Sequence, residues 1–268
     1  MSDHRPANTA YWNELATIHK DAAFYDVASF RMGKSTLHDL ELEELGDIRG
    51  KSLLHLQCHI GVDTLSLARL GARVTGVDFS DKAVSVATEL SRELSIDGRF
   101  IQADVLELPR LLDEQFDIVY TSYGVLCWLP DLMKWGQVIG KLLKRGGRFV
   151  IVEDHPLAYV LDDDCQPDNL KIGFPYFDEA MLTITAKGTY ATDIPFEQPM
   201  EIHEWTHPLQ DIFAGLLGAG LRIDSFREYR KCAWKRFPWM VSDDNGWWHL
   251  PPNMLSVPLL FSLTATKE

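Results

Sequence analysis

Between residues 51 and 154, short apolar runs alternate with amphipathic stretches. The runs LLHLQ, ARVTGVDFS, RFIQAD, FDIVYTSYG and RFVIVED are typical of buried strands. Helical patterns follow several of them, in DTLSLARLG, DKAVSVATELSREL and LPDLMKWGQVIGKLLK. Strands joined by crossover helices pair in parallel, and the helices then cover both faces of the sheet. This alternation predicts an α/β fold built on a mostly parallel sheet.

The flanking segments have different patterns. Apolar residues at mixed helical spacing in residues 11–46 predict helices with a turn near Gly33, and residues 156–205 are loop-rich with strands predicted in MLTITAKGTYATD. Pro208 opens a helix that ends near Gly218 or Gly220, and LRIDSFREYR and VPLLFSLTATK predict two final strands. We expect a single domain with a helical lid (1–46), a cofactor-binding core (51–154), an insertion capping the acceptor (155–205), and a terminal helix and strand pair (206–268).

Composition narrows the class of protein. With 268 residues the chain can bury a full core. Its net charge of −13 argues against electrostatic binding of nucleic acid, although basic residues cluster in 227–236. The four cysteines form no CxxC pair, which favours reduced thiols. The first residues lack a signal-peptide pattern, and no apolar run approaches the roughly 18 residues of a membrane span. We expect a cytoplasmic protein.

Three strand ends carry residues suited to a nucleoside. In an open parallel sheet, ligands bind outside the carboxyl ends of the strands. The stretch LHLQCHIG ends the first strand and opens a helix, so its backbone N–H groups face that crevice. Asp78 ends the second strand, where a carboxylate can accept from both ribose hydroxyls, and Asp104 ends the third, where it can accept from an adenine amine. Together these ends predict a nucleoside cofactor.

The run from Lys51 to Asp154 resembles a class I S-adenosylmethionine-dependent methyltransferase. LHLQCHIG, VDFS, QADVLEL and FDIVYTSYGVLCWL match that superfamily's first four motifs, and LLKRGGRFVIVE matches the turn before its fifth strand. LHLQCHIGVDTLSLARLGA and YTSYGVLCWLPD are similar to a bacterial subgroup whose first motif has few glycines. The resemblance implies a Rossmann-like sheet of seven strands, mostly parallel with an antiparallel final strand. It also implies S-adenosylmethionine as the cofactor and S-adenosylhomocysteine as its product.

The first motif departs from the superfamily's usual pattern. That pattern has an acidic residue at the place of His55 and glycines at those of Gln57 and His59. Glycine allows close backbone approach to a ligand, so these side chains must turn aside or join in binding. The resemblance implies that the methionine moiety meets Gln57, His59, Gly61 and Thr121, the ribose meets Asp78, and the adenine meets Phe79, Asp104 and Val105. Cys58, in the same turn, is a further candidate cofactor-binding residue, and its side chain is expected to be a small packing group.

The acceptor is expected beneath three covering segments. These are the N-terminal helices, the stretch beginning EDHP, and the loop KCAWKRFPWMVSDDNGWWHLPPNM. Its aromatic residues suit an apolar or aromatic acceptor, or a cationic amine held by ring faces beside Asp243 and Asp244. Alternatively, they pack the loop onto the domain. The candidate acceptor-binding residues are Trp205, Trp239, Trp247 and Trp248, and the candidate bases are His155, Tyr123 and His207. A deprotonated amine would need no base.

One further motif suggests zinc. His203 to His207 reads HEWTH and matches the H-E-x-x-H pattern, which requires both histidines on one helical face. Pro208 disfavours helical geometry at His207, so we expect a strand-to-helix junction there and no metal.

Two alternatives to an enzyme of this class stay open. A nicotinamide-dependent oxidoreductase shares the strand-helix-strand-acid pattern but typically carries the motif G-x-G-x-x-G, which is absent here. A nucleoside-binding regulatory protein without turnover is compatible with the glycine-poor turn. Our prediction is a methyltransferase that moves a methyl group by in-line displacement to a nitrogen or oxygen of a small molecule. Neither the oligomeric state nor the acceptor is indicated.

Overall fold

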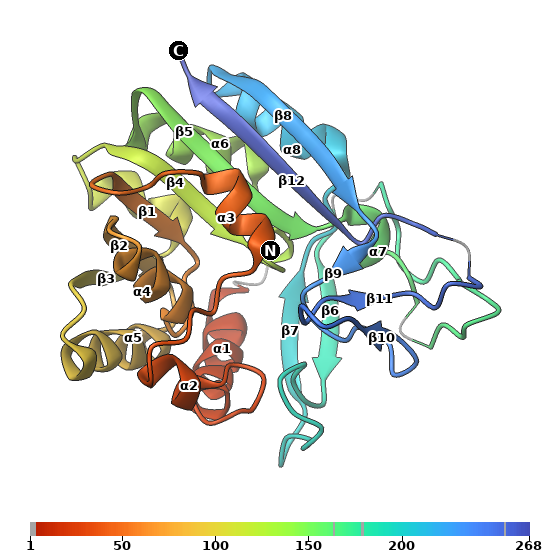
Figure 1. The fold of residues 1–268 in the computed structure, drawn as a ribbon. Coiled ribbons are helices and arrows are strands. Elements are labelled where there is room, and N and C mark those ends of the chain that lie inside the picture. The colour runs from red at the N-terminus through yellow and green to blue at the C-terminus, as the bar shows by residue number, and fades with distance from the viewer. Residues whose placement is uncertain (1–3, 163, 178–179, 255) are drawn as a thin grey trace.

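The computed structural model describes residues 4–162, 164–177, 180–254 and 256–268. The remaining residues of the predicted lid and insertion lie outside this part of the chain. Seven strands form one sheet in the order β3-β2-β1-β4-β5-β12-β8 (Figure 1). The strands are β1 Ser52–Leu56, β2 Arg73–Asp78, β3 Gly98–Gln102, β4 Phe116–Ser122, β5 Leu143–Asp154, β8 Leu221–Tyr229 and β12 Leu260–Lys267.

The strand directions match the predicted fold class. β1 to β5 pair in parallel, while β12 runs antiparallel between β5 and β8. The predicted sheet of seven strands, mostly parallel with an antiparallel final strand, is therefore confirmed. Because the carboxyl ends of β1 to β5 all open at one edge of the sheet, residues far apart in the sequence meet there.

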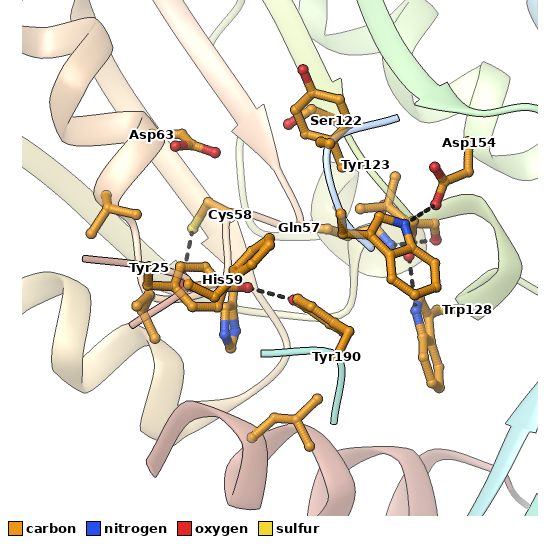
Figure 2. A pocket seen from close by; sticks show the side chains of 18 of the residues that line it. Tyr25, Gln57, Cys58, His59, Asp63, Ser122, Tyr123, Trp128, Asp154 and Tyr190 are labelled. Atoms are coloured by element: carbon orange, nitrogen blue, oxygen red, sulfur yellow. Dashed lines mark hydrogen bonds between the residues drawn. The ribbon is translucent and has the colours of Figure 1, made fainter. Parts of the chain in front are cut away.

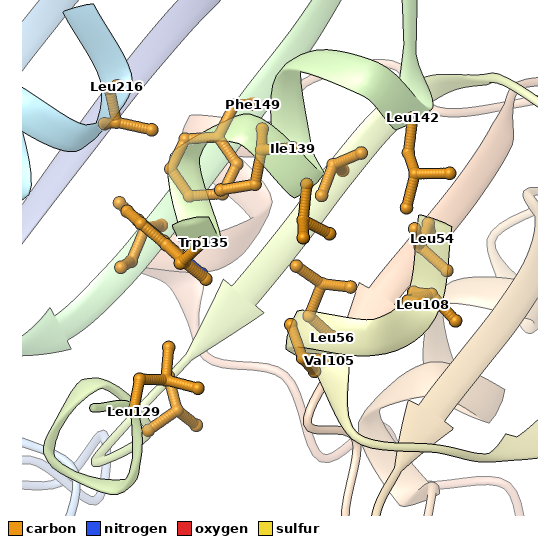
Figure 3. Close-up of a cluster of buried hydrophobic side chains, with 14 of the residues drawn as sticks. Leu54, Leu56, Val105, Leu108, Leu129, Trp135, Ile139, Leu142, Phe149 and Leu216 are labelled. Atoms are coloured by element: carbon orange, nitrogen blue, oxygen red, sulfur yellow. The ribbon is translucent and has the colours of Figure 1, made fainter. Parts of the chain in front are cut away.

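Helices cover both faces of the sheet, as the strand patterns require. They are α4 Val62–Arg69, α5 Asp81–Leu94, α6 Leu132–Leu142 and α8 Leu209–Gly218, with 3₁₀ turns η1 Val105–Arg110 and η2 Leu126–Trp128. Ser80 caps α5 by accepting from the Ala83 N–H at 3.0 Å. On one face, Leu54 and Leu56 pack with Trp135 and Phe149 beneath α6 and α8 (Figure 3). Alternate strand residues such as Leu53 pack on the other face against α4.

Most segments outside the sheet lie at its carboxyl edge, whereas the third N-terminal helix packs on a face of the sheet, where Arg148 of β5 donates to the Glu44 carbonyl at 2.7 Å (Figure 1). The N-terminal helices are α1 Arg5–His19, α2 Val27–Arg31 and α3 Asp39–Leu45, and a short helix α7 Pro156–Tyr159 follows β5. The insertion forms an antiparallel hairpin of β6 Leu182–Ala186 and β7 Met200–Glu204. Asn8 ties α1 to this hairpin, because its side chain donates to the His203 carbonyl and accepts from the His203 N–H, both at 2.8 Å.

Some local expectations differ from the structure. The stretch between β8 and β12, expected as a loop, contains a small sheet of β9 Lys231–Cys232, β10 Val241–Ser242 and β11 Trp248–His249. Strands of two residues carry no periodicity that a sequence can reveal. The Gly146-Gly147 turn lies within β5, where Gly146 has a φ of 72° and the pairing register with β4 shifts.

Two other expectations concern His203 and the membrane. The predicted strand-to-helix junction is confirmed, because His203 lies in β7 and His207 precedes α8. The two histidines thus share no helical face. Within the described ranges, the structure contains no helix with the length and apolar character of a bilayer span.

Candidate functional site

A cavity of about 750 Å³ opens at the carboxyl edge of the sheet. Its floor is formed by residues at the carboxyl ends of β1, β2, β4 and β5, including His59, Phe79, Tyr123 and Asp154. The N-terminal helices, the insertion hairpin and the loop before β12 supply its walls. The three covering segments expected from the sequence therefore meet over one cavity, which Figure 2 shows from close by.

The turn after β1 adopts the backbone geometry of a glycine-rich loop without the glycines. Gln57, His59 and Gly61 have φ values of 55°, 49° and 76°. Such positive values are unfavourable for side chains other than glycine. The Gln57 side chain turns aside and donates from Nε2 to the Val125 carbonyl at 2.9 Å. At Gly61 no side chain fits, because a Cβ there would lie 2.6 Å from that of Ala87.

His59 links this turn to the covering segments. Its Nε2 lies 2.8 Å from Nδ1 of His19 in α1, and the other ring nitrogen of His19 contacts the hydroxyl of Thr189 from the insertion. Burial lowers the pKa of His19 to about 3, so this chain of contacts holds neutral rings. Beside it, the hydroxyls of Tyr25 and Tyr190 share a hydrogen bond across the cavity mouth (Figure 2).

Asp78 shares a wall with the turn. Its Oδ2 accepts from the His59 N–H at 2.8 Å, and its Oδ1 accepts from the Ser80 N–H at 2.9 Å. Burial raises the pKa of Asp78 to about 6. The carboxylate is thus ionised at neutral pH, and each oxygen retains a lone pair for a ligand hydroxyl. Phe79, the next residue, also lines the cavity.

The polar atoms along this wall fit an amino-acid ligand moiety. Gln57 Oε1 and His59 Nδ1 are buried and have no hydrogen-bond partner among the described residues. Buried polar atoms normally find partners. An acceptor and a ring nitrogen at this place suit the ammonium and carboxylate of methionine. The residues present therefore fit S-adenosylmethionine along the turn and Asp78.

Four predicted cofactor residues are not among those that line the cavity: Gly61, Asp104, Val105 and Thr121. Asp104 caps η1 by accepting from the Leu106 N–H at 2.8 Å, and Val105 is buried in the core beneath α6. Thr121 donates to the Leu56 carbonyl at 3.3 Å and so joins β4 to β1. Cys58 lines the cavity, and burial raises the pKa of its thiol. A contact of Asp104, Val105 or Thr121 with the cofactor stays a prediction.

Of the three candidate bases, Tyr123 alone lines the cavity. Burial, together with the charge of Glu41, raises the pKa of Tyr123, so its hydroxyl is neutral at neutral pH. His155 instead caps α7 by accepting from the Leu157 N–H, and its Nε2 lies 3.0 Å from Glu228. His207 lies beside the Leu129 carbonyl, with 2.8 Å between its Nε2 and that oxygen.

Two of the four candidate acceptor-binding tryptophans line the cavity, and the other two do not. Trp205 and Trp248 line the cavity. Trp239 instead stacks on Phe237 and donates to the Cys165 carbonyl, while Trp247 is buried and donates to Asp39. Trp239 and Trp247 therefore pack the loop onto the domain, which is the alternative considered for these aromatic residues.

Sequence reasoning missed several lining residues. Asp154 ends β5 just as Asp78 ends β2, so the same argument about strand ends would have found it. Tyr159 follows β5 in α7, and Tyr190 and Glu204 come from the insertion. No spacing in the sequence relates those insertion residues to β1, because only the tertiary fold brings them together.

Comparisons with known proteins identify the class of this domain. Residues 54–151 match the family model described as a methyltransferase domain. The ubiquinone biosynthesis O-methyltransferase of Nitrosococcus oceani is 30% identical over 177 residues, which are 63% of this chain and 69% of that protein. The protein of the same name from Pseudomonas entomophila is 28% identical over 63% of this chain and 71% of its own length.

Solved structures agree on the fold. An S-adenosylmethionine-dependent methyltransferase structure from Listeria monocytogenes, described there as putative, superposes with a TM-score of 0.60 at 18% identity, covering 90% of this chain and 99% of that one. The chain belongs to the class I S-adenosylmethionine-dependent methyltransferases. It is an enzyme, and its cofactor is S-adenosylmethionine.

Proposed function

We propose that the turn at residues 57–61 and Asp78 hold S-adenosylmethionine, and that the rest of the same cavity holds a small-molecule acceptor with a nitrogen or oxygen nucleophile. The observation that carries this proposal is the shared wall. The strained turn and the Asp78 carboxylate are joined by the 2.8 Å hydrogen bond from the His59 N–H. Their placement fits the amino-acid and ribose parts of one elongated ligand.

Each residue of the wall has a distinct task in this proposal. Gln57 and His59 bind the methionine end through their backbone and through the buried side-chain atoms described above. Asp78 accepts hydrogen bonds from the ribose hydroxyls. The cofactor supplies an electrophilic methyl carbon, which the acceptor attacks in line with the breaking carbon–sulfur bond. Tyr123 is suited to orient the acceptor by a hydrogen bond from its neutral hydroxyl.

Enclosure of the cavity supports a small acceptor. Its walls carry Tyr11, Trp128, Trp205 and Trp234, and aromatic enclosures of several hundred Å³ are typical of small-molecule sites. The net charge of −13 favours such an acceptor over nucleic acid. We propose a cytoplasmic location from the cysteines, which are all free and buried.

Calorimetric titration with S-adenosylmethionine, S-adenosylhomocysteine and NADH, carried out on separate samples, tests the cofactor site. We expect saturable binding of the two sulfur nucleosides alone. Asp78→Asn should weaken both by about tenfold to a hundredfold, because one hydrogen-bonded carboxylate is worth roughly 1.5–3 kcal/mol. Equal affinity of the variant and the parent would remove Asp78 from the proposal, and binding of NADH alone would contradict the whole donor site.

A further inference from the structure

We infer that the acceptor is an amine, held between the carboxylates of Asp154 and Glu204 and enclosed by aromatic rings. This inference rests on the proposed function and names the substrate class of the same cavity. Figure 2 places Asp154 and Trp128 at one end of the cavity, across from Cys58 and Asp63 near the turn. That end is therefore available to an acceptor when the turn and Asp78 hold the methyl donor.

The two carboxylates come from different elements and act on the same groups. Asp154 ends β5, is 7% exposed, and accepts from Nε1 of Trp234 at 3.2 Å. Glu204 ends β7, and both carboxylates line the cavity. Burial raises the pKa of Tyr159, and the nearby Cys127, Glu204, Asp154 and Glu153 raise it further, so this ring lies near both carboxylates. A ligand near Tyr159 therefore meets negative potential from both carboxylates.

The rings around the pair are held in place by hydrogen bonds. Nε1 of Trp128 donates to the Gly124 carbonyl at 3.0 Å, and the Tyr159 hydroxyl lies 2.9 Å from the Cys127 thiol. Trp234 is fixed by its contact with Asp154. Ring faces attract ammonium groups, and the attraction increases when water is excluded. Fixed rings beside a buried carboxylate thus form a site for a cationic nitrogen.

The cations near the cavity do not reverse this charge balance. Among the described lining residues, Lys34 and Arg236 are the basic ones. Lys34 is 70% exposed and lies 3.4 Å from Asp26. Arg236 donates to the Leu161 carbonyl at 3.1 Å, and its charge acts to lower the pKa of Asp154. Arg236 thereby helps to keep Asp154 ionised, although burial raises the pKa of this carboxyl to about 6.

The groups in the cavity account for the proton, the bonds and the charge of the methyl transfer. In water an amine is mostly an ammonium ion, which has no lone pair, so one proton must leave before attack. The Asp154 carboxylate accepts that proton and passes it to solvent. The nitrogen lone pair then forms the nitrogen–carbon bond as the carbon–sulfur bond breaks, and the broken bond's electron pair stays on sulfur. The positive charge moves from sulfur to nitrogen, so the acidic walls stabilise the charge before and after transfer.

A set of matched probes tests the inference. Protein saturated with S-adenosylhomocysteine is titrated with 2-phenylethylamine, 2-phenylethanol and 3-phenylpropionate, which share a ring and a two-carbon spacer but differ in charge. We expect the amine to bind about tenfold more tightly than the other two, because ring and carboxylate contacts to a cation are worth roughly 1–2 kcal/mol. Asp154→Asn and Glu204→Gln should each abolish most of this preference.

The control and the contrary outcomes separate this inference from the proposed function. Glu201→Gln changes an exposed carboxylate on the same strand as Glu204 and should leave the preference intact. Preference for the alcohol or the propionate, equal affinity for all three, or no amine binding would overturn the inference. The affinity for S-adenosylhomocysteine is measured first in each protein. If the parent protein does not bind S-adenosylhomocysteine, the proposed function is contradicted. If it binds S-adenosylhomocysteine but shows no preference for the amine, only the inference of an amine acceptor is overturned.

Discussion

At the residue scale, Glu153 illustrates how one buried side chain shapes the cavity floor. Its carboxylate is 1% exposed and accepts from the N–H groups of Val125 at 2.9 Å, Leu126 at 3.3 Å and Asp154 at 2.7 Å. These bonds hold the turn after β4, whose Val125 carbonyl in turn fixes the Gln57 side chain. Glu153 thus positions the turn without lining the cavity itself.

Truncation of Glu153 should therefore be costly. Glu153→Ala leaves several buried N–H groups without an acceptor, so we expect the free energy of unfolding to fall by about 3 kcal/mol or more in urea denaturation. Glu153→Gln keeps one carbonyl oxygen and should lose less. As a control, Glu107→Gln alters partly exposed ion pairs and should change stability by about 0.5 kcal/mol or less. A loss below about 1 kcal/mol in Glu153→Ala would refute this role.

Individual site residues could be predicted where local pattern and fold rule coincide. Asp78 and Gln57 were found because a strand pattern ends at each, and carboxyl ends of parallel strands share an edge. Glu204 was considered only as part of a zinc motif, since its place in the cavity lining depends on the insertion hairpin packing against α1.

At the element scale, α6 and α8 approach each other through two glycines. A Cβ on Gly136 would lie 2.0 Å from the carbonyl oxygen of Gly215, and one on Gly215 would lie 2.4 Å from that of Leu132. Both contacts are with backbone, which cannot move aside without separating the helices. The close crossing buries Leu216 and Trp135 in the largest described core cluster (Figure 3).

We expect Gly136→Ala to destabilise the fold. Overpacking costs about 1–3 kcal/mol and should exceed the roughly 1 kcal/mol that alanine contributes to helix propensity. Gly188→Ala is a matched control, because its Cβ would meet nothing closer than 3.7 Å. Thermal and urea unfolding compare the two variants. If Gly136→Ala were as stable as Gly188→Ala, the backbone contact would not constrain the packing.

Elements were predictable in proportion to their length and periodicity. α8 and the strands β8 and β12 were located from extended patterns bounded by Pro208 and glycines. The two-residue strands β9 to β11 were not, because they are too short to carry a periodicity.

At the scale of the whole molecule, buried acids and buried histidines give opposite pH dependences. Burial raises the pKa of Glu41 from 4.5 to about 8, so the folded state binds its proton more tightly than the unfolded state. Stability from this group therefore falls as pH rises through that window. Burial lowers the pKa of His55 from 6.5 to about 3, so stability from this group falls as pH drops below 6.5. Above pH 6.5 the contribution of His55 to the free energy of unfolding no longer changes with pH, whereas that of Glu41 continues to fall.

The free energy of unfolding of the ligand-free protein should thus decrease from about pH 6.5 to pH 8. Glu41 alone contributes a slope of up to roughly 1.4 kcal/mol per pH unit in that window. Glu41→Gln removes this titration and should make the profile less steep; a slope of the same sign remains, because burial also raises the pKa of Glu153 to about 8. Urea denaturation at a series of pH values measures both proteins. A profile for the parent that rises over this window would contradict the assignment.

The molecule as a whole was predictable as a sheet with covering segments, but the closure of the cavity was not. Periodicity indicates strands and helices because it is local. The contacts that join His59 to His19 and Tyr25 to Tyr190 depend on side chains brought together by the complete fold.

A crystal structure of the complex with S-adenosylhomocysteine tests the central claim most directly. We predict that its amino-acid end contacts residues 57–61, that its ribose hydroxyls donate to Asp78, and that the space between Asp154 and Glu204 remains open to an acceptor. Density for the nucleoside between Asp154 and Glu204, with the turn and Asp78 uncontacted, would contradict the account.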